Sequence, residues 1–162
     1  MAARNRAPVL DWQKFTERGE PVAHVVVHHL RPGFVQPMHA HRFAEVFWCQ
    51  TGGCNHMVNG QSMRFSEGTL VMLRPSDTHE LRAGPDEECV YSLGSFPRAV
   101  YDRMRRLYEP DDPGFWGGRD PMPRTLTLTP GQREWFDAAF RGLARAPQDR
   151  LALDRFLLNL VY

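Results

Sequence analysis

Two stretches of the sequence decide the fold: GFVQPMHAHRFAEVFWCQTG at 33–52 and GTLVMLRPSDTH at 68–79. Together they hold four candidate metal ligands, which are His39, His41, Glu45 and His79. His39 and His41 share strand parity, so both side chains can point to one side of a sheet, and Glu45 keeps that parity if the strand continues without a bulge. Imidazole nitrogens and a carboxylate oxygen together suit a first-row divalent metal. We expect the four residues to bind one divalent transition metal: zinc, nickel, iron or manganese.

The spacing of the first stretch resembles the first motif of the cupin family. That motif is a glycine, five residues, His-x-His, three or four residues, a glutamate, six residues and a glycine, and the sequence follows it without a gap at Gly33, His39, His41, Glu45 and Gly52. The resemblance implies a mainly β fold, a cupin-type antiparallel β-barrel or jelly roll, with these side chains coordinating a metal.

The second stretch is similar to the second cupin motif, with Gly68, Pro75 and His79 at the matching positions. Asp77 stands where glycine is usual, and Ala83 stands where an asparagine often closes the motif. These departures concern the loop geometry around His79 rather than the ligand itself. His79 therefore remains the fourth expected ligand.

Length and composition predict one globular core, since the chain has 162 residues, 42% of them hydrophobic and 24% charged. The formal net charge of +1 provides no bulk electrostatic attraction for nucleic acid or an anionic membrane. No apolar stretch has the length of a signal-peptide core or a transmembrane span, and we expect a cytoplasmic protein. Cys49, Cys54 and Cys89 lack paired Cys-x-x-Cys spacing, so we expect reduced thiols.

Short apolar runs between glycine- and proline-containing turns predict an antiparallel sandwich or barrel in the first part of the chain. The expected strands are 22–30, 45–51, 54–58, 61–65, 70–73 and 88–93. Asn59 and Gly60 tolerate positive φ and predict a two-residue type I′ hairpin. Both faces of 45–51 are apolar, which is typical of a barrel wall that is covered on the outside.

Three further residues are candidates for contact with a small ligand: Phe47, Cys49 and His56. Phe47 and Cys49 share a strand face with Glu45, so they belong to the same side of the barrel wall. His56 lies two residues after Cys54 on one strand face, where such a pair is more often packing than a binding site.

From Arg98 the apolar residues recur at helical spacing. We therefore divide the chain into a barrel at 1–97 and a helical extension at 98–162. The extension is expected to hold helices at about 98–109, 130–145 and 149–162, and a loop at 110–129 packed by Phe115 and Trp116. Thr129 is the expected cap of the second helix, with Gln132 completing a capping box.

The last helix is too apolar to face water on all sides, so we expect it either to dock in a dimer interface or to precede another domain. Its apolar stripe consists of Phe156, Leu157, Leu160 and Val161, widened by Leu151 and Leu153. One side of the stripe can rest on the helix that carries Trp135 and Phe140. The other side is then expected to pair with a second subunit.

A barrel followed by such helices resembles the N-terminal ligand-sensing and dimerisation domain of AraC-family transcription regulators, most closely the sugar-responsive branch with regulators of chitooligosaccharide use. The residues that carry this match are EVFW at 45–48, RPSDTH at 74–79 and LALDRFLL at 151–158. The resemblance implies a small-molecule ligand, for example a carbohydrate, in the barrel and a homodimer formed through the C-terminal helices. It also places the DNA-reading helix-turn-helix units beyond Tyr162, so we expect no DNA binding by this fragment alone.

The four metal ligands are equally typical of a second class of protein, a stand-alone metal-dependent cupin enzyme such as a dioxygenase, isomerase or decarboxylase. The apolar terminal helix and the layout after Arg98 favour the sensor, because an isolated barrel enzyme would not need them. We assign no catalytic residue from the sequence.

Overall fold

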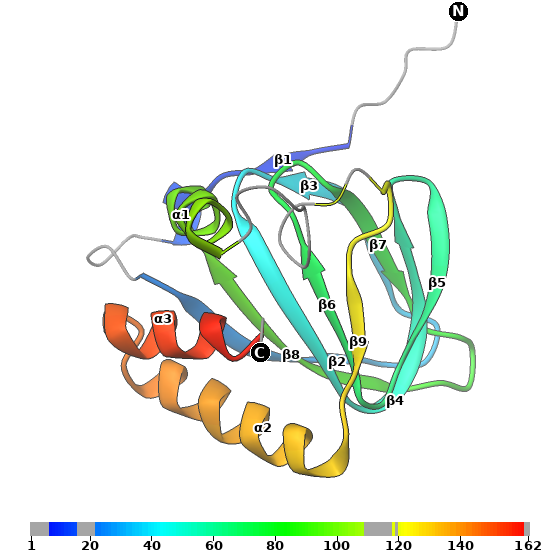
Figure 1. Cartoon of the computed structure of the whole chain (residues 1–162). Helices are drawn as coiled ribbons and strands as arrows, with labels where there is room; N and C mark the ends of the chain where they lie inside the picture. Colours follow the sequence, from blue (N-terminus) through cyan, green and yellow to red (C-terminus); the bar gives the residue numbers. More distant parts are fainter. Residues whose placement is uncertain (1–6, 16–21, 109–117, 119, 161–162) are drawn as a thin grey trace, which may run out of the picture.

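The structure, a computed structural model, describes residues 7–15, 22–108, 118 and 120–160. Strands form two sheets that face each other, and helices cover the outer side of one sheet (Figure 1). In chain order the elements are β1 Val9–Leu10, the 3-10 helix η1 Trp12–Phe15, β2 His24–Leu30, β3 Val35–His41, β4 Ala44–Val58, β5 Gln61–Ser66, β6 Thr69–Leu73, β7 Thr78–Arg82, β8 Cys89–Phe96, α1 Arg98–Tyr108, β9 Thr125–Thr127, α2 Pro130–Arg145 and α3 Arg150–Leu158.

We call the two sheets sheet I and sheet II. Sheet I has the order β1-β3-β7-β4-β5, and sheet II has the order β2-β8-β4-β6-β9. All pairings are antiparallel except that of β1 with β3. Among the described residues no strand pairing closes the sheets into a ring. The two facing sheets form the cupin-type jelly roll that the sequence resemblance implies.

The long strand β4 belongs to both sheets and joins them. Its first part pairs with β6 and β8 in sheet II, and its second part pairs with β5 and β7 in sheet I. The prediction of two separate strands at 45–51 and 54–58 is therefore wrong: the chain passes through Gly52 without a break, after a bulge between Cys49 and Thr51. Gly52 has φ of +73°, and a Cβ there would lie 2.0 Å from the carbonyl oxygen of Glu88, so only glycine fits.

The hairpin between β4 and β5 has the predicted form. Asn59 and Gly60 have φ of +49° and +82°, both positive as a type I′ turn requires. Strands β2, β5, β6 and β8 confirm the other expected strands, with β8 continuing to Phe96. Strands β1, β7 and β9 were not expected, because they are short and owe their conformation to the partners beside them.

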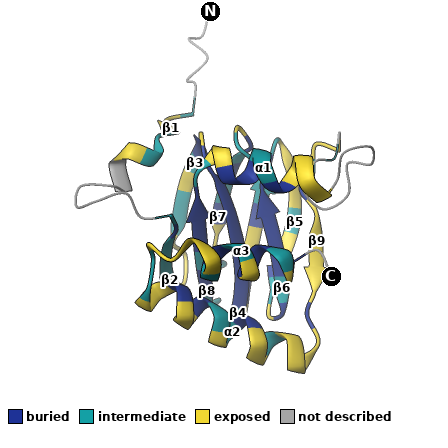
Figure 2. Cartoon of the chain, turned by 60° about the vertical axis from the view of Figure 1, so that its left-hand side comes forward, coloured by how far each residue is buried: buried dark blue, intermediate teal, exposed yellow. Residues whose placement is uncertain are grey.

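The helices pack on the outer face of sheet II, where they cover the buried strands β4, β6 and β8 (Figure 2). Trp48 and Met72 from the sheet share one apolar cluster with Phe136, Phe140 and residues of α1 and α3. A second apolar cluster, which includes Phe47, lies between the sheets. The expectation that β4 is apolar on both faces because it is covered on the outside is confirmed.

The helix predictions hold within a few residues. The capping box of Thr129 and Gln132 is present at the start of α2. The last helix is shorter than the expected 149–162, since α3 ends at Leu158 and Asn159 and Leu160 form a turn. The loop prediction for Phe115 and Trp116 lies outside the described residues. No helix in the described ranges is long and apolar enough to span a membrane.

The apolar stripe of the last helix is used within the chain. Phe156, Leu157 and Leu160 are at most 4% exposed and belong to the cluster beneath the helices. The expectation that one side of this stripe is left for a second subunit is therefore wrong for these three residues, because sheet II takes the place of the partner. Leu151 alone among the described stripe residues is largely exposed, at 68%.

Candidate metal centre and ligand pocket

Three of the four predicted ligands meet between the two sheets. His41 at the end of β3 and His79 on β7 come from sheet I, and Glu45 at the start of β4 comes from sheet II. Glu45 Oε2 lies 3.2 Å from His41 Nε2 and 3.8 Å from His79 Nε2. All three residues are buried, and their ligand atoms lie within 4.8 Å of one another. Two atoms that are each about 2.1 Å from one metal ion lie roughly 3–4 Å apart, so the distances from Glu45 to the two histidines suit a shared ion.

The strand register and the course of the backbone explain how these side chains reach the site. The register of β3 on β7 places His39 opposite His79, and Ala40 opposite Thr78. Glu45 does not reach the site by continued strand parity as expected, because β3 ends at His41 and the chain bends before β4 begins. It reaches the site from the opposite sheet instead, and the site is therefore a product of how the sheets face each other.

Hydrogen bonds determine which nitrogen of His41 is available. His41 Nδ1 lies 2.6 Å from the carbonyl oxygen of Phe43. A carbonyl oxygen only accepts, so Nδ1 carries the proton and Nε2 presents a lone pair. That lone pair faces the Glu45 carboxylate, whose other oxygen accepts a 3.1 Å hydrogen bond from Ser95 Oγ. Two lone-pair atoms at this distance, away from water, require a cation between them, either a proton or a metal ion.

The pKa values of His41 and His79 reflect the burial of the site and the charges within it. Burial is the largest single influence and works to lower the pKa of His41, but the charge of Glu45 and the hydrogen bonds to Glu45 and Phe43 together outweigh it, and the pKa is raised. The pKa of His79 is well below its usual value, first through burial and then through the neighbouring histidines. His79 Nδ1 lies 3.3 Å from His56 Nε2, whereas His79 Nε2 and His41 Nε2 have no hydrogen-bond partner. A metal ion binds Nε2 only without its proton, so at His41 the ion would take the place of the proton that the raised pKa favours.

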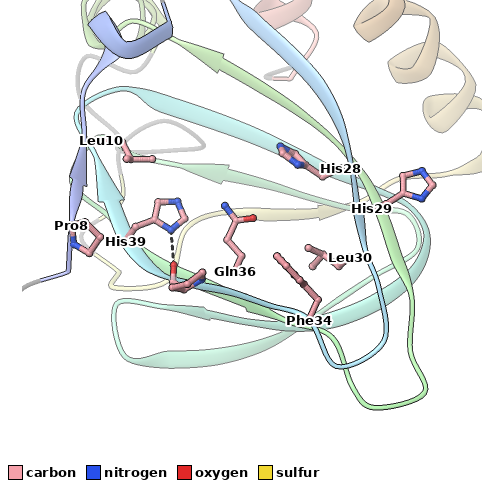
Figure 3. A pocket seen from close by; sticks show the side chains of 9 residues that line it. Pro8, Leu10, His28, His29, Leu30, Phe34, Gln36 and His39 are labelled. Atoms are coloured by element: carbon pink, nitrogen blue, oxygen red, sulfur yellow. Dashed lines mark hydrogen bonds between the residues drawn. The ribbon is translucent and has the colours of Figure 1, made fainter.

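His39, the fourth predicted ligand, lies beside this group of three but outside it. Its ring centroid is 4.2 Å from that of His79 and 6.3 Å from that of His41. His39 Nδ1 donates to the carbonyl oxygen of Pro37 at 2.8 Å, so its Nε2 also presents a lone pair (Figure 3). His39 could therefore add a fourth nitrogen from the side on which the pocket opens.

A pocket of about 520 Å³ leads from the surface to His39 (Figure 3). It lies between β1, β2 and β3, and its lining consists of Pro8, Leu10, His28, His29, Leu30, Phe34, Gln36, Pro37 and His39. The Gln36 side chain lies between His39 and Phe34 in Figure 3, and His28 lies across from it. His28 stacks on Tyr91 with ring centroids 5.2 Å apart, and Tyr91 donates a 3.5 Å hydrogen bond to Gln36 Oε1. The metal centre and the pocket thus share His39.

The three residues expected to contact a ligand do not line this pocket. Phe47 and His56 are buried beside His79, with ring centroids 5.4 and 5.5 Å from it. Cys49 lies further along β4, with its Sγ 3.8 Å from that of Cys89. Hydrogen bonding to Cys89, followed by burial, raises the pKa of the Cys49 thiol. Phe47 and His56 thus pack against His79, one of the candidate metal ligands. Their contact with a small ligand remains a prediction.

Several pocket residues were not predicted from the sequence. His28 and Leu30 share one parity on β2 and point into the barrel, and this alternation was the one signal that could have revealed them. Leu10 reaches the pocket because β1 pairs in parallel with the end of β3, a contact between segments about thirty residues apart. No pattern within a single stretch of sequence predicts such a contact.

Comparison with known proteins places this architecture in a family. Among solved structures, ToxT from Vibrio cholerae O395, bound to (E)-4-(8-methylnaphthalen-1-yl)but-3-enoic acid, is 10% identical and has a TM-score of 0.63, with 86% of this chain and 55% of that chain covered. A cupin 2 conserved barrel domain protein from Salinispora arenicola is 22% identical with a TM-score of 0.46, covering 54% of this chain and 73% of that one. A cupin protein from Bacteroides fragilis is 19% identical with a TM-score of 0.44, covering 46% and 65%.

This chain therefore spans less than two thirds of the length of ToxT and of the Bacteroides protein. A search of curated proteins found no match. The family model described as the AraC-like ligand binding domain matches residues 22–161, which include the pocket strands β2 and β3, the metal-ligand candidates and the closing helices. The chain belongs to the family of AraC-like ligand-binding domains.

Proposed function

We propose that this chain is the sensor domain of a cytoplasmic transcription regulator and that it binds one divalent metal ion. His41, Glu45 and His79 would hold the ion, with His39 as the fourth ligand. The observation that carries the metal is the meeting of three buried ligand atoms, His41 Nε2, His79 Nε2 and Glu45 Oε2, of which the two nitrogens have no hydrogen-bond partner. Buried polar atoms without partners are costly, and a divalent cation pairs with all three at once.

The residues around the centre support this role. The carbonyl oxygens of Pro37 and Phe43 hold His39 and His41 in the tautomer with a free Nε2, and Ser95 orients the Glu45 carboxylate. His56 holds the ring of His79 through Nδ1. When bound, the metal supplies a Lewis-acid centre that attracts an oxygen atom of a ligand.

The pocket beside His39 is the proposed binding site for a small molecule. The carbohydrate suggested by the sequence resemblance remains a prediction. Strand β2 connects the pocket with the helices: His28 lines the pocket, while Val25 on the same strand packs against the cluster beneath the helices. A ligand that moves β2 would thereby bias the packing of α2 and α3, and through them a DNA-binding part of the regulator.

The self-association implied by the family resemblance is proposed to use the outer side of α2 and α3. A groove of about 360 Å³ lies between these helices, lined by Trp135, Arg155, Phe156 and neighbouring small residues. Trp135 is 38% exposed, and Leu151, one turn before Arg155, is 68% exposed. A second copy of this chain would bury both. Sedimentation of the native chain beside a Trp135→Glu, Leu151→Glu variant tests this, and a native monomer at tens of micromolar would contradict it.

Elemental analysis of protein purified without chelators tests the metal centre. We expect about one divalent ion per chain and a large loss in His41→Ala and His79→Ala variants. His29→Ala is the matched control, because His29 lies on the exposed face of β2 and should leave the metal content unchanged. Bound metal should also fall as the pH falls, since protons compete for the Nε2 atoms. Metal-free native protein whose thermal stability does not change on adding zinc, nickel or iron would overturn the proposal.

A further inference from the structure

The chemistry of the pocket lining restricts which small molecules it can hold. Five of its nine residues are apolar, namely Pro8, Leu10, Leu30, Phe34 and Pro37. The other four are three histidines and Gln36. The nine lining residues include no carboxylate, no lysine or arginine and no hydroxyl. The lining therefore offers a large apolar wall and very few hydrogen-bonding groups.

The few polar groups converge on the inner end of the pocket. In Figure 3 the Gln36 amide lies between His39 and Phe34, and the ring of His28 lies across from it, whereas the His29 side chain points away from the other labelled residues. Gln36 Oε1 accepts the hydrogen bond from Tyr91, which leaves the amide NH₂ to donate to a ligand. An acceptor oxygen is the atom that this end of the pocket can recognise.

Charge favours an anionic oxygen at the same end. The proposed divalent ion carries +2 and Glu45 carries −1, so the centre beside His39 would have a net charge of +1, and this step rests on the proposed metal. The apolar side chains lie on both sides of Gln36, with Leu10 and Pro8 toward β1 and Leu30 and Phe34 toward β2 and the turn (Figure 3). Phe34 is 49% exposed at the rim, where a bound apolar group would cover it.

A carbohydrate fits this lining poorly. Each ring carries several hydroxyl groups that need donors and acceptors once they leave water, and a sugar site supplies them from carboxylates and amides. Here one amide and three imidazoles face five apolar residues.

We infer that the ligand of this pocket is an amphipathic monocarboxylic acid. Its carboxylate lies at the inner end beside Gln36 and His39, and its aliphatic or aromatic body lies along Leu10, Leu30 and Phe34. The volume of about 520 Å³ falls within the range of small-molecule pockets and accommodates a body of medium chain length or a fused ring.

Isothermal titration calorimetry on the zinc-loaded chain, residues 1–162, tests this inference. The probes are decanoate, 1-decanol, 2-naphthoate and N,N′-diacetylchitobiose. We expect both acids to bind, the alcohol to bind at least tenfold more weakly than decanoate, which is about 1.4 kcal/mol, and the disaccharide not to bind. Gln36→Leu should weaken decanoate at least tenfold, while Gln61→Leu, an exposed position on β5, should not.

A second variant distinguishes a loss of ligand binding from a loss of folding. Phe34→Ser changes a half-exposed side chain at the rim, so the protein should fold, and it should weaken decanoate while leaving butyrate unchanged. Tight binding of the disaccharide that Gln36→Leu abolishes would overturn the carboxylic acid but keep the sensor pocket. Binding of neither probe class by metal-loaded protein would overturn this inference alone. The metal content of the same sample reports separately on the proposed function.

Discussion

The packing of α2 on sheet II at Gly94 of β8 makes a quantitative prediction. A Cβ at Gly94 would lie 3.1 Å from Phe140 Cε1 on α2 and 3.3 Å from Val46 Cγ1. Both neighbours belong to the buried cluster beneath the helices, and Phe140 also packs on Phe156 with ring centroids 4.9 Å apart. The ring therefore has little room to move away from an added methyl group.

Gly94→Ala should destabilise the native protein. Overpacking of a dense core costs about 1–3 kcal/mol. Alanine loses less backbone freedom on folding than glycine does, and this offsets roughly 0.5–1 kcal/mol of that cost. The expected net loss is about 1 kcal/mol, a measurable share of a total stability on the order of 5–15 kcal/mol. Phe140→Leu removes the ring atoms that approach Gly94 and should itself cost roughly 1–2 kcal/mol, as expected for a few buried carbon atoms.

The two substitutions should not be additive. In the Phe140→Leu background the clash with the ring is relieved and only the contact with Val46 remains, so the loss on Gly94→Ala should shrink towards zero. Urea unfolding of the four proteins, followed by tryptophan fluorescence and far-ultraviolet circular dichroism at one protein and metal concentration, measures the cycle. An equal loss on Gly94→Ala in both backgrounds would refute the docking of α2 on β8 as described.

Three other outcomes are expected from the structure. Burial is the main reason that the pKa of His56 falls from 6.5 to about 4. Its neutral form therefore stabilises the fold above pH 6.5, and roughly 3 kcal/mol is lost as the pH falls from 6.5 to 4. Equilibrium unfolding in chelator should show a smaller acid loss for His56→Phe than for the native chain, and the remainder comes from groups such as His79, whose pKa burial also lowers. Asp77→Ala should cost about 2–3 kcal/mol in urea unfolding, because buried Asp77 accepts hydrogen bonds from Arg74 and Asn59 and its loss leaves the partly buried guanidinium with carbonyl partners but no counter-charge. A loss below 1 kcal/mol would contradict this. Thr129→Ala should cost about 1 kcal/mol through loss of the capping box of α2, measured as a shift in the urea midpoint, whereas Thr129→Ser should be nearly neutral.

Local signals in the sequence were sufficient for much of the fold. The turn at Asn59 and Gly60 follows from the tolerance of these residues for positive φ, and the start of α2 follows from the side-chain chemistry of Thr129 and Gln132. The resemblance to the cupin and AraC-type patterns also anticipated the double-sheet architecture and the family. These features depend on neighbouring residues or on spacing within one stretch, which a sequence displays directly.

Other features depended on contacts between distant segments. The merger of two expected strands into β4 depends on Gly52 passing close to Glu88, a contact across two strands. The apolar stripe of α3 looked like a surface for a second subunit because the sequence indicates a covered wall at 45–51 but does not show which element covers it. The hydrophobic effect is non-directional, so only the tertiary structure decides which partner buries an apolar surface.

The same division holds for the site. The spacing of His39, His41, Glu45 and His79 was enough to select the candidate ligands, since the types of donor atom and their motif are properties of the sequence. The tertiary structure decided that Glu45 faces two of the histidines from the opposite sheet, that His39 stands at the pocket, and that the pocket is lined by Leu10, His28 and Gln36. The physical reason is that ligand geometry and pocket shape arise from the packing of two sheets, and this packing sums many long-range contacts that no single stretch of sequence contains.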